Sequence, residues 1–174
     1  KIHGYRLFNH IQKNYKKNLK DKKILEIGCG SGFLLGLFKK KNCEVLGIEP
    51  SNIKRNNDIN IKKDFFLKTK IESKFDIITS NAVLEHEFHP NKFLKKSYND
   101  LKIGGMNFIC VPDYTKLIRN GDPTLINHEH INYFTKSNLE YYLKKNKFIK
   151  VRVFSDKFGN LFGLGFKGRK KTNK

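Results

Sequence analysis

The residues from Ile24 to Leu35 constrain the fold of this chain more than any other stretch. An apolar run is broken by Gly28, Gly30 and Gly32, and apolar residues then resume at helical spacing. This pattern predicts a strand, a tight turn and a helix. Glycine permits positive φ angles and close approach to a ligand, and a helix start offers unpaired N–H groups. We therefore expect a ligand-binding turn; a β-hairpin or a helix C-cap is the alternative.

The spacing of these glycines indicates which ligand the turn holds. A dinucleotide-binding turn needs G-x-G-x-x-G, whose third glycine would fall where this chain has Phe33. Glu26 stands two residues before the first glycine, and Glu49 ends the next apolar run. Carboxylates at these two positions can accept hydrogen bonds from an ammonium group and from a ribose diol. The pattern favours an adenosyl ligand without phosphates.

Four motifs together resemble the class I S-adenosylmethionine-dependent methyltransferases, in particular the small-molecule and sugar methyltransferases among them. They are Glu26-x-Gly28-x-Gly30-x-Gly32 with Glu49, then Lys63-Asp64-Phe65, Phe75 to His86, and Leu101 to Gly105. The resemblance covers almost the whole chain. It implies an α/β fold with a Rossmann-like, seven-stranded, mostly parallel sheet, an antiparallel last strand and helices on both faces. It also implies S-adenosyl-L-methionine as the cofactor.

Twelve residues are expected to bind this cofactor. They are Glu26, Gly28, Cys29, Gly30, Gly32, Glu49, Pro50, Asp64, Phe65, Asn81, Tyr5 and Arg6. By the resemblance, Tyr5 and Arg6 would reach the methionine carboxylate from a covering helix, with packing and solvation as the alternative. Asp64 would accept the adenine amino group, with Phe65 near the ring; a solvated turn aspartate is its alternative role.

The length and the patterning predict a single methyltransferase domain over residues 1–174, with a covering helix over 1–20 and a basic tail over 167–174. Apolar periodicity places the other elements along the chain. We expect strands at 24–27, 44–48, 60–63, 75–80, 106–111, 148–154 and 161–166, and helices after Gly32, Ser51, His89 and Thr135, with Gly104-Gly105 ending the third and an irregular connection over 114–130. The chain does not begin with Met, so we expect that residues can precede Lys1 in the native protein.

The net charge of +20 would ordinarily indicate a polyanionic partner. Only five of the 36 basic residues are arginine, and the lysines are scattered along every segment. Because arginine is the preferred residue for bidentate recognition of phosphate and guanine, its scarcity argues against a nucleic-acid partner.

The three cysteines show no C-x-x-C spacing and no even set for pairing, which predicts a reduced, cytoplasmic protein. The chain has no apolar stretch long enough to span a membrane, and its first residues lack the apolar core of a signal peptide. We therefore expect neither a membrane span nor secretion.

Candidate catalytic residues lie where ligands bind parallel sheets, at the carboxyl ends of the strands. The polar residues expected there are Glu49, Asp64, Asn81, Glu85, His86, Asp113 and the run from Asn127 to His130. An alcohol acceptor must lose its proton, and histidine is the natural base at neutral pH. We favour His130 as the base and expect His86 and Glu129 beside it; a structural role is the alternative for both histidines.

The resemblance to sugar methyltransferases extends to this cluster. Some of those enzymes use a His after the fourth strand and a Glu-His pair before Tyr-Phe, which His86, Glu129 and His130 match. They also place a Tyr where this chain has Asn127, which argues against carbon methylation. A metal hypothesis comes from His128, Glu129, His130 and His89, but no accompanying ligand motif supports it, and no metal is expected.

The expected function is therefore methylation of a small-molecule acceptor, with an O-methylated sugar, nucleotide sugar or related metabolite favoured. An RNA or DNA methyltransferase is the alternative, although Ser80 to Leu84 lacks the two prolines typical of amino-methylating nucleic-acid enzymes. A noncatalytic module that only binds S-adenosylmethionine is an alternative of another class.

Overall fold

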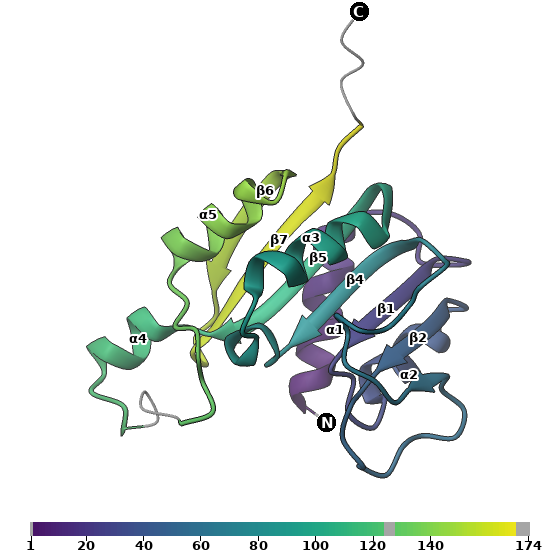
Figure 1. Cartoon of the computed structure of the whole chain (residues 1–174), viewed down its shortest axis with the longest axis horizontal. Coiled ribbons are helices and arrows are strands. Elements are labelled where there is room, and N and C mark those ends of the chain that lie inside the picture. Colours follow the sequence, from purple (N-terminus) through teal and green to yellow (C-terminus); the bar gives the residue numbers. More distant parts are fainter. Residues whose placement is uncertain (1, 124–127, 170–174) are drawn as a thin grey trace, which may run out of the picture.

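A seven-stranded sheet forms the middle layer of the molecule (Figure 1). The structure is a computed structural model, and it describes residues 2–123 and 128–169. The strands are β1 (Lys23–Ile27), β2 (Glu44–Ile48), β3 (Ile61–Lys62), β4 (Phe75–Asn81), β5 (Leu101–Pro112), β6 (Phe148–Ser155) and β7 (Asn160–Lys167). Their order is β3-β2-β1-β4-β5-β7-β6, with β7 antiparallel to both of its neighbours and every other pairing parallel. This arrangement confirms the predicted fold.

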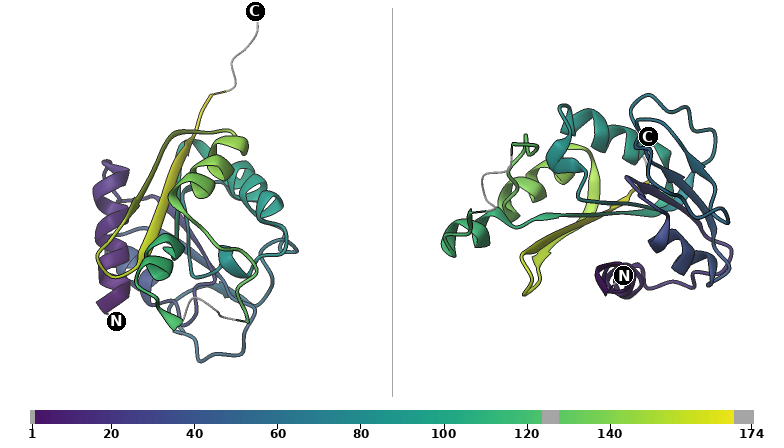
Figure 2. Two further views of the ribbon diagram at one scale, coloured as in Figure 1. Left: turned by 90° about the vertical axis from the view of Figure 1, so that its left-hand side faces the viewer. Right: turned by 90° about the horizontal axis from the view of Figure 1, so that it is seen from below.

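Helices cover both faces of this sheet (Figure 2). The first face carries α1 (Ile2–Tyr15) and α2 (Phe33–Lys39), and the second carries α3 (Pro90–Asp100) and α5 (Lys136–Lys145). Two short helices, η1 (Leu84–His86) and α4 (Tyr114–Arg119), follow the carboxyl ends of β4 and β5. Alternate residues of β1 separate the two cores, since Ile24 packs under α1 and α2 while Leu25 and Ile27 face the other side.

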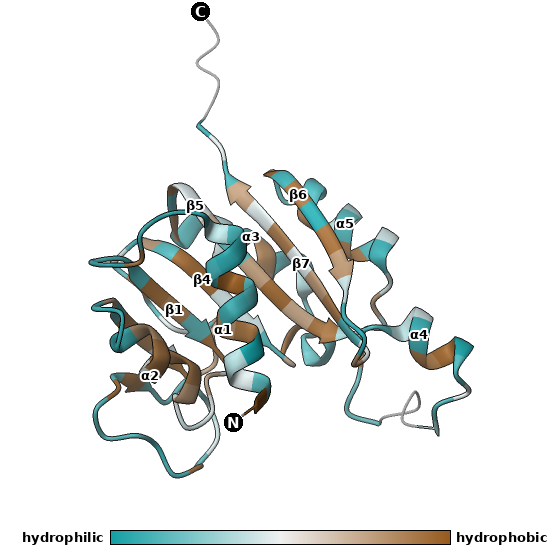
Figure 3. Cartoon of the chain, turned by 180° about the vertical axis from the view of Figure 1, so that it is seen from behind, coloured by the Kyte–Doolittle hydropathy of each residue, from teal (hydrophilic) through white to brown (hydrophobic). Residues whose placement is uncertain are grey.

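The N-terminal helix lies across the first face of the sheet, where Figure 3 shows apolar strands beneath it. Its buried residues are Leu7, Phe8, Ile11 and Tyr15, which lie on one face of the helix. The helix is shorter than predicted, because it ends at Tyr15 and Lys16 takes a φ of 54°. Leu19 still packs into the same core from the loop that follows. The basic tail extends beyond residue 169 and lies largely outside the described residues.

Three expectations about local structure are wrong. No helix follows Ser51: its backbone N–H bonds the Glu49 carboxylate, and the chain runs irregularly to β3. Helix α3 is not ended by the glycine pair; β5 begins directly after it, at Leu101, and Gly105 lies inside that strand. The connection that was expected to be irregular contains α4.

Helix α5 begins as the sequence predicts. The Thr135 hydroxyl accepts the N–H of Asn138, and the Asn138 side chain accepts the N–H of Thr135. All three cysteines are buried free thiols, as their spacing indicates. Over residues 2–123 and 128–169, none of the helices has both the length and the apolar character that crossing a membrane requires.

Candidate active site

The glycine turn joins β1 to α2, and its backbone has the predicted conformation. Gly28, Gly30 and Gly32 have φ angles of 68°, 52° and 84°. A Cβ on Gly28 would lie 2.4 Å from the Val83 side chain, so only glycine fits beside the segment that follows β4. At Gly30 an added Cβ would meet only Ile53, at 3.5 Å, so this part of the turn keeps open space for a ligand.

Glu49 at the end of β2 holds this turn through its carboxylate. One oxygen accepts the N–H of Gly30 at 2.8 Å and the other accepts the N–H of Ser51 at 2.9 Å. Burial raises the pKa of Glu49, but hydrogen bonds from Ser51 and Gly30, together with nearby Arg55, outweigh it and leave the pKa below its usual value. The group is therefore an anion at neutral pH, and each oxygen retains lone pairs for a further donor.

Glu26 on β1 is a buried carboxyl that faces the same turn from beneath. It is 5% exposed, and one of its oxygens has no hydrogen-bond partner among the described residues. Burial raises its pKa well above the usual value, against a hydrogen bond from the Leu35 backbone, and neighbouring Glu49 raises it further. A cationic group at this turn would supply the missing partner and stabilise the charged carboxylate.

A cavity of about 640 Å³ opens beside the turn, at the carboxyl ends of β1, β2 and β4. It brings together five of the predicted residues: Gly28, Glu49, Pro50, Phe65 and His86. Carboxylate acceptors on one side and apolar walls on the other suit a nucleoside with a charged tail. The residues present therefore fit S-adenosylmethionine. Glu26, which lies beneath the turn and has one buried oxygen without a partner among the described residues, would accept its ammonium group, and the ionised Glu49 carboxylate in the cavity lining would accept its ribose hydroxyls.

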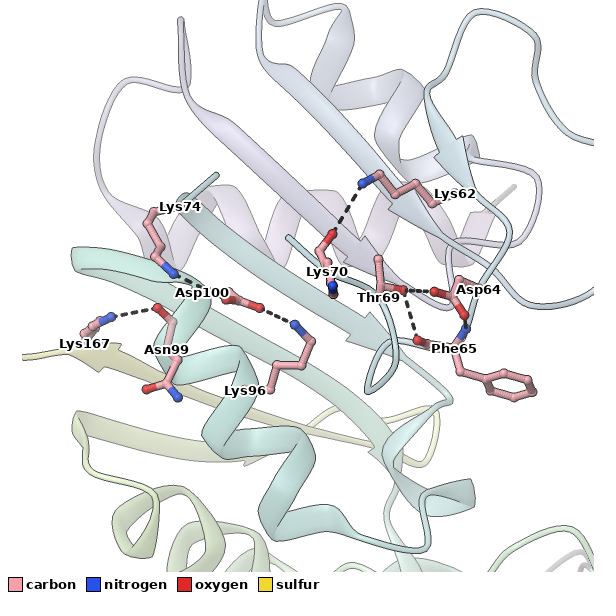
Figure 4. Close-up of polar contacts among 10 residues, drawn as sticks. All are labelled: Lys62, Asp64, Phe65, Thr69, Lys70, Lys74, Lys96, Asn99, Asp100 and Lys167. Atoms are coloured by element: carbon pink, nitrogen blue, oxygen red, sulfur yellow. Dashed lines mark hydrogen bonds and ion pairs between the residues drawn. The ribbon is translucent and has the colours of Figure 1, made fainter. Parts of the chain in front are cut away.

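Asp64 does not reach this cavity. Its carboxylate accepts hydrogen bonds from the Phe65 backbone at 2.7 Å and from the Thr69 hydroxyl at 3.0 Å (Figure 4). These are the contacts of a turn aspartate, the alternative interpretation given above. The Phe65 ring points away from the carboxylate, lines the cavity and is 60% exposed.

Seven other predicted cofactor residues are not in the lining of the cavity: Glu26, Gly30 and Gly32 of the glycine turn and its strand, and Cys29, Asn81, Tyr5 and Arg6. The Asn81 side-chain oxygen accepts a hydrogen bond from His3 Nε2 of α1 at 2.9 Å. Tyr5 packs edge-on against Phe33, and Arg6 lies 3.8 Å over the ring of Phe158. Cys29 is buried and turns its sulfur toward Gly47, so that only its backbone faces the ligand side.

The two candidate bases lie together, with ring centroids 4.8 Å apart. His86 Nδ1 lies 2.8 Å from the backbone carbonyl oxygen of Glu129, which can only accept a hydrogen bond. The proton of neutral His86 is therefore on Nδ1, and Nε2 carries a free lone pair. His130 Nδ1 contacts the Tyr114 hydroxyl. Burial lowers the pKa of His130, and neighbouring His86 lowers it further.

Glu85 completes this cluster from beneath. It is fully buried, and neither carboxylate oxygen has a hydrogen-bond partner within the described ranges. Burial raises its pKa to about 7. One donor atom each from Glu85, His86 and His130 lie within 4.8 Å of one another, so these three residues have the spacing of a metal site. This group shares only His130 with the set of metal ligands considered from sequence. The absence of a metal stays a prediction.

Two members of this cluster were not assigned a role from sequence. Glu85 was one of several polar residues at the strand ends, and the turn of η1 directs it inward, under the histidines. Tyr114 belonged to the stretch expected to be irregular, yet it directly follows the polar residue Asp113 at the end of β5. Its position at a strand end was the available signal. Asn127, whose identity argues against carbon methylation, lies outside the described residues.

The sheet order, the glycine turn and the acidic end of β2 define a class I methyltransferase. Comparison with known families agrees, since residues 2–152 match the model of the methyltransferase domain family. The chain belongs to this family, whose cofactor is S-adenosylmethionine.

Curated relatives share about a third of their aligned residues with the chain. A ubiquinone biosynthesis O-methyltransferase of Coxiella burnetii is 30% identical over 122 residues, which cover 62% of this chain and 52% of the relative. The corresponding protein of Pelagibacter ubique is 34% identical over 111 residues, covering 57% and 45%. The chain thus spans about half the length of these relatives.

Solved structures show the same fold at low sequence identity. A Burkholderia thailandensis 1,6-didemethyltoxoflavin-N1-methyltransferase with bound S-adenosylhomocysteine has a TM-score of 0.74 at 13% identity, over 95% of this chain and 78% of that one. A Haemonchus contortus phosphoethanolamine N-methyltransferase with bound S-adenosylhomocysteine also has a TM-score of 0.74 at 13% identity, over 95% and 53%.

Proposed function

We propose that this protein transfers the methyl group of S-adenosylmethionine to a hydroxyl of a small-molecule acceptor, and that the acceptor is a sugar, a nucleotide sugar or a related metabolite. The observation that carries the proposal is His86, an imidazole in the wall of the cavity whose Nδ1 is fixed on a backbone carbonyl. Such a group can accept the proton of an alcohol.

The chain's own carboxylates hold the cofactor in this proposal. Glu49 accepts the two ribose hydroxyls through the lone pairs that Gly30 and Ser51 leave free. Glu26 faces the ammonium group, which supplies its missing partner. When bound, S-adenosylmethionine supplies a methyl group on a positively charged sulfur, and the protein contributes mainly by aligning this group with the acceptor oxygen.

Two observations favour His86 over His130 as the base. His86 lines the cavity, and its hydrogen bond leaves Nε2 free to take a proton. His130 can act in the same way only if its Nδ1 donates to the Tyr114 hydroxyl, and it is not in the cavity lining. We assign to Glu85 the role of stabilising the imidazolium that forms on His86, through its negative charge when ionised. His130, whose pKa is lowered, stays a neutral neighbour that adds no competing positive charge.

The names of the curated relatives support oxygen as the atom methylated, since each is called an O-methyltransferase. They also favour a second class of acceptor, intermediates of ubiquinone biosynthesis. The cavity wall near His86 carries Phe88, which is 77% exposed and could stack on an aromatic ring. A panel of acceptors must therefore contain both nucleotide sugars and intermediates of ubiquinone biosynthesis.

Replacement of His86 tests the mechanism. His86→Gln can keep a donor for the Glu129 carbonyl but cannot take a proton at neutral pH, so kcat should fall by about 10²- to 10⁴-fold. The dissociation constant for S-adenosylhomocysteine, measured by calorimetry, should stay unchanged. The control is His128→Gln, which replaces an exposed histidine of the following loop.

Three outcomes would contradict parts of the proposal. Near-normal turnover of His86→Gln together with an inactive His130→Gln would exchange the roles of the two histidines. Full activity of both would mean that methyl transfer depends on positioning alone. Saturable cofactor binding without turnover on any acceptor would favour a noncatalytic binding module.

A further inference from the structure

A second cavity, of about 560 Å³, lies at the far end of the sheet from β3, between α4, the start of α5 and the end of β6. Figures 1 and 2 both show α4 and α5 at this end of the molecule. We call it the polar cavity. Its lining is entirely polar or charged: Asp113, Thr115, Lys116, Arg119, Thr135, Lys136, Ser137 and Ser155. The first cavity, which the proposed function assigns to the cofactor, is called the cofactor cavity, and none of its lining residues belongs to the polar cavity.

Asp113 is the residue of this lining that most clearly indicates a ligand. It is only 2% exposed, and one carboxylate oxygen accepts the Ser155 hydroxyl at 2.5 Å. The other oxygen is buried and has no hydrogen-bond partner in the part of the chain that the structure describes. A buried carboxylate oxygen without a donor is costly, and a bound hydroxyl group would satisfy it.

Three cations share the lining with this carboxylate. Lys116 bonds the backbone carbonyl of Asp156, while Arg119 and Lys136 are exposed at the rim. Arginine offers the planar, forked donor set that suits phosphate, and Lys136 is the first residue of α5, where backbone N–H groups and the helix dipole also favour an anion. Since the cations outnumber the carboxylate, the cavity as a whole favours negative charge.

The combination of one carboxylate with three cations distinguishes between classes of ligand. A bare anion would meet the Asp113 carboxylate, and a simple cation would meet three positive charges. A phosphate ester of a polyol satisfies both parts, with its phosphate among the cations and one of its hydroxyls donating to Asp113. We propose that the polar cavity binds a phosphorylated polyol, such as a sugar phosphate.

The polar cavity is also close to the proposed reaction centre. Asp113 in its lining is directly followed by Tyr114, whose hydroxyl contacts His130. Consecutive Cα atoms are about 3.8 Å apart, so a single residue step connects the two sites. The further step, that this ligand is the methyl acceptor or part of it, rests on the proposed function; binding in the polar cavity does not.

Calorimetry with glucose 1-phosphate, glucose and inorganic phosphate tests the binding. We expect glucose 1-phosphate to bind more tightly than either of the other two. The double variant Arg119→Gln/Lys136→Gln should weaken its binding by about 10-fold or more, because two charge-assisted contacts are lost. The matched control Lys92→Gln/Lys95→Gln removes two exposed charges of α3 and should bind it as the wild type does.

Asp113→Asn tests the hydroxyl contact. It should reduce the ratio between the affinity for glucose 1-phosphate and the affinity for inorganic phosphate. Its melting temperature must be measured, and if it does not fold, the double variant of the two exposed residues still decides the matter. Equal binding by the double variant and the wild type would overturn the proposal, as would failure of the wild type to bind glucose 1-phosphate, or to prefer it over phosphate.

Two further measurements separate this proposal from the proposed function. The affinity of the double variant for S-adenosylhomocysteine should equal that of the wild type, because the cofactor lies in the other cavity. Transfer of a labelled methyl group to glucose 1-phosphate would identify the bound phosphate ester as an acceptor. Binding without transfer, alongside methylation of another acceptor, would support the polar cavity as a site for a separate ligand.

Discussion

Glu49 holds the glycine turn and, in the proposed function, also binds the cofactor, so its removal should affect both. Glu49→Ala deletes the acceptor for the Gly30 and Ser51 N–H groups and the proposed contact to the ribose. A charge-assisted, bidentate contact is worth about 2 kcal/mol or more, so affinity for S-adenosylhomocysteine should fall at least about 30-fold. Calorimetry measures this loss. Glu44→Ala is the control, since Glu44 lies at the other end of β2 and pairs with Lys23; an unchanged dissociation constant in Glu49→Ala would remove Glu49 from the site.

Glu85 should make the stability of the fold depend on pH. Its pKa is raised from the ordinary 4.5 to about 7 in the folded chain, so between these values the native state binds more protons than the unfolded state. The free energy of unfolding should therefore fall as pH rises from 4.5 to about 7 and then level off. Glu85→Gln removes this loss and should be more stable than the wild type by up to about 3 kcal/mol above pH 7.

Urea unfolding at about pH 5 and about pH 8 measures this difference. Glu140→Gln is the control, because Glu140 is paired with Lys144 on the surface of α5. The same pH dependence in Glu85→Gln and the wild type would show that the Glu85 carboxyl is not held in its protonated form.

At this scale the sequence predicted the positions of single residues better than it predicted the contacts that they make. Glu49 and Gly28 lie where their motif places them, because the motif fixes the backbone around them. Asp64 instead turns to the Thr69 hydroxyl, a donor five residues further along the chain that a strand-end pattern does not reveal. The pairing of His86 with Glu129 spans 43 residues, and only the folded chain shows that the partner is a backbone carbonyl rather than the side chain.

Among the elements, α1 should depend on its buried face for its place on the sheet. Ile11→Ala removes a side chain that is fully buried between this helix and the sheet and should lower the free energy of unfolding by about 2–4 kcal/mol. Ile2→Ala, on the same helix, changes a side chain that is 78% exposed and should have an effect within about 0.5 kcal/mol. Denaturant unfolding compares the two variants. Equal effects would mean that α1 does not pack as described.

The elements also show where apolar patterning stops being sufficient. Strands and helices with clear periodicity were predicted correctly, while Gly104 and Gly105 were taken as a helix end. Both glycines instead lie in β5. At Gly105 this strand is so close to β4 that a Cβ would lie 3.0 Å from the Phe75 carbonyl oxygen. The register between these strands shifts at the same place. A glycine required by a neighbouring strand cannot be distinguished from a stop signal without that neighbour.

At the scale of the molecule, the net charge of +20 should give weak and unspecific binding to nucleic acid. Each phosphate contact contributes roughly −0.9 to the slope of log affinity against log salt concentration, so such binding should vanish near about 0.15 M salt. Fluorescence anisotropy with labelled RNA and DNA checks this prediction. Tight, sequence-selective binding at that salt concentration would instead support a nucleic-acid substrate.

The position of β7 has a consequence for synthesis of the protein. This strand follows all the others in sequence, yet it lies between β5 and β6 and pairs with both. While the chain is being translated, the apolar edge of β5 therefore stays unpaired until residues 160–167 have left the ribosome. An unpaired apolar edge readily joins other chains, so a product terminated before Asn160 should aggregate even though every residue of the cofactor cavity is present.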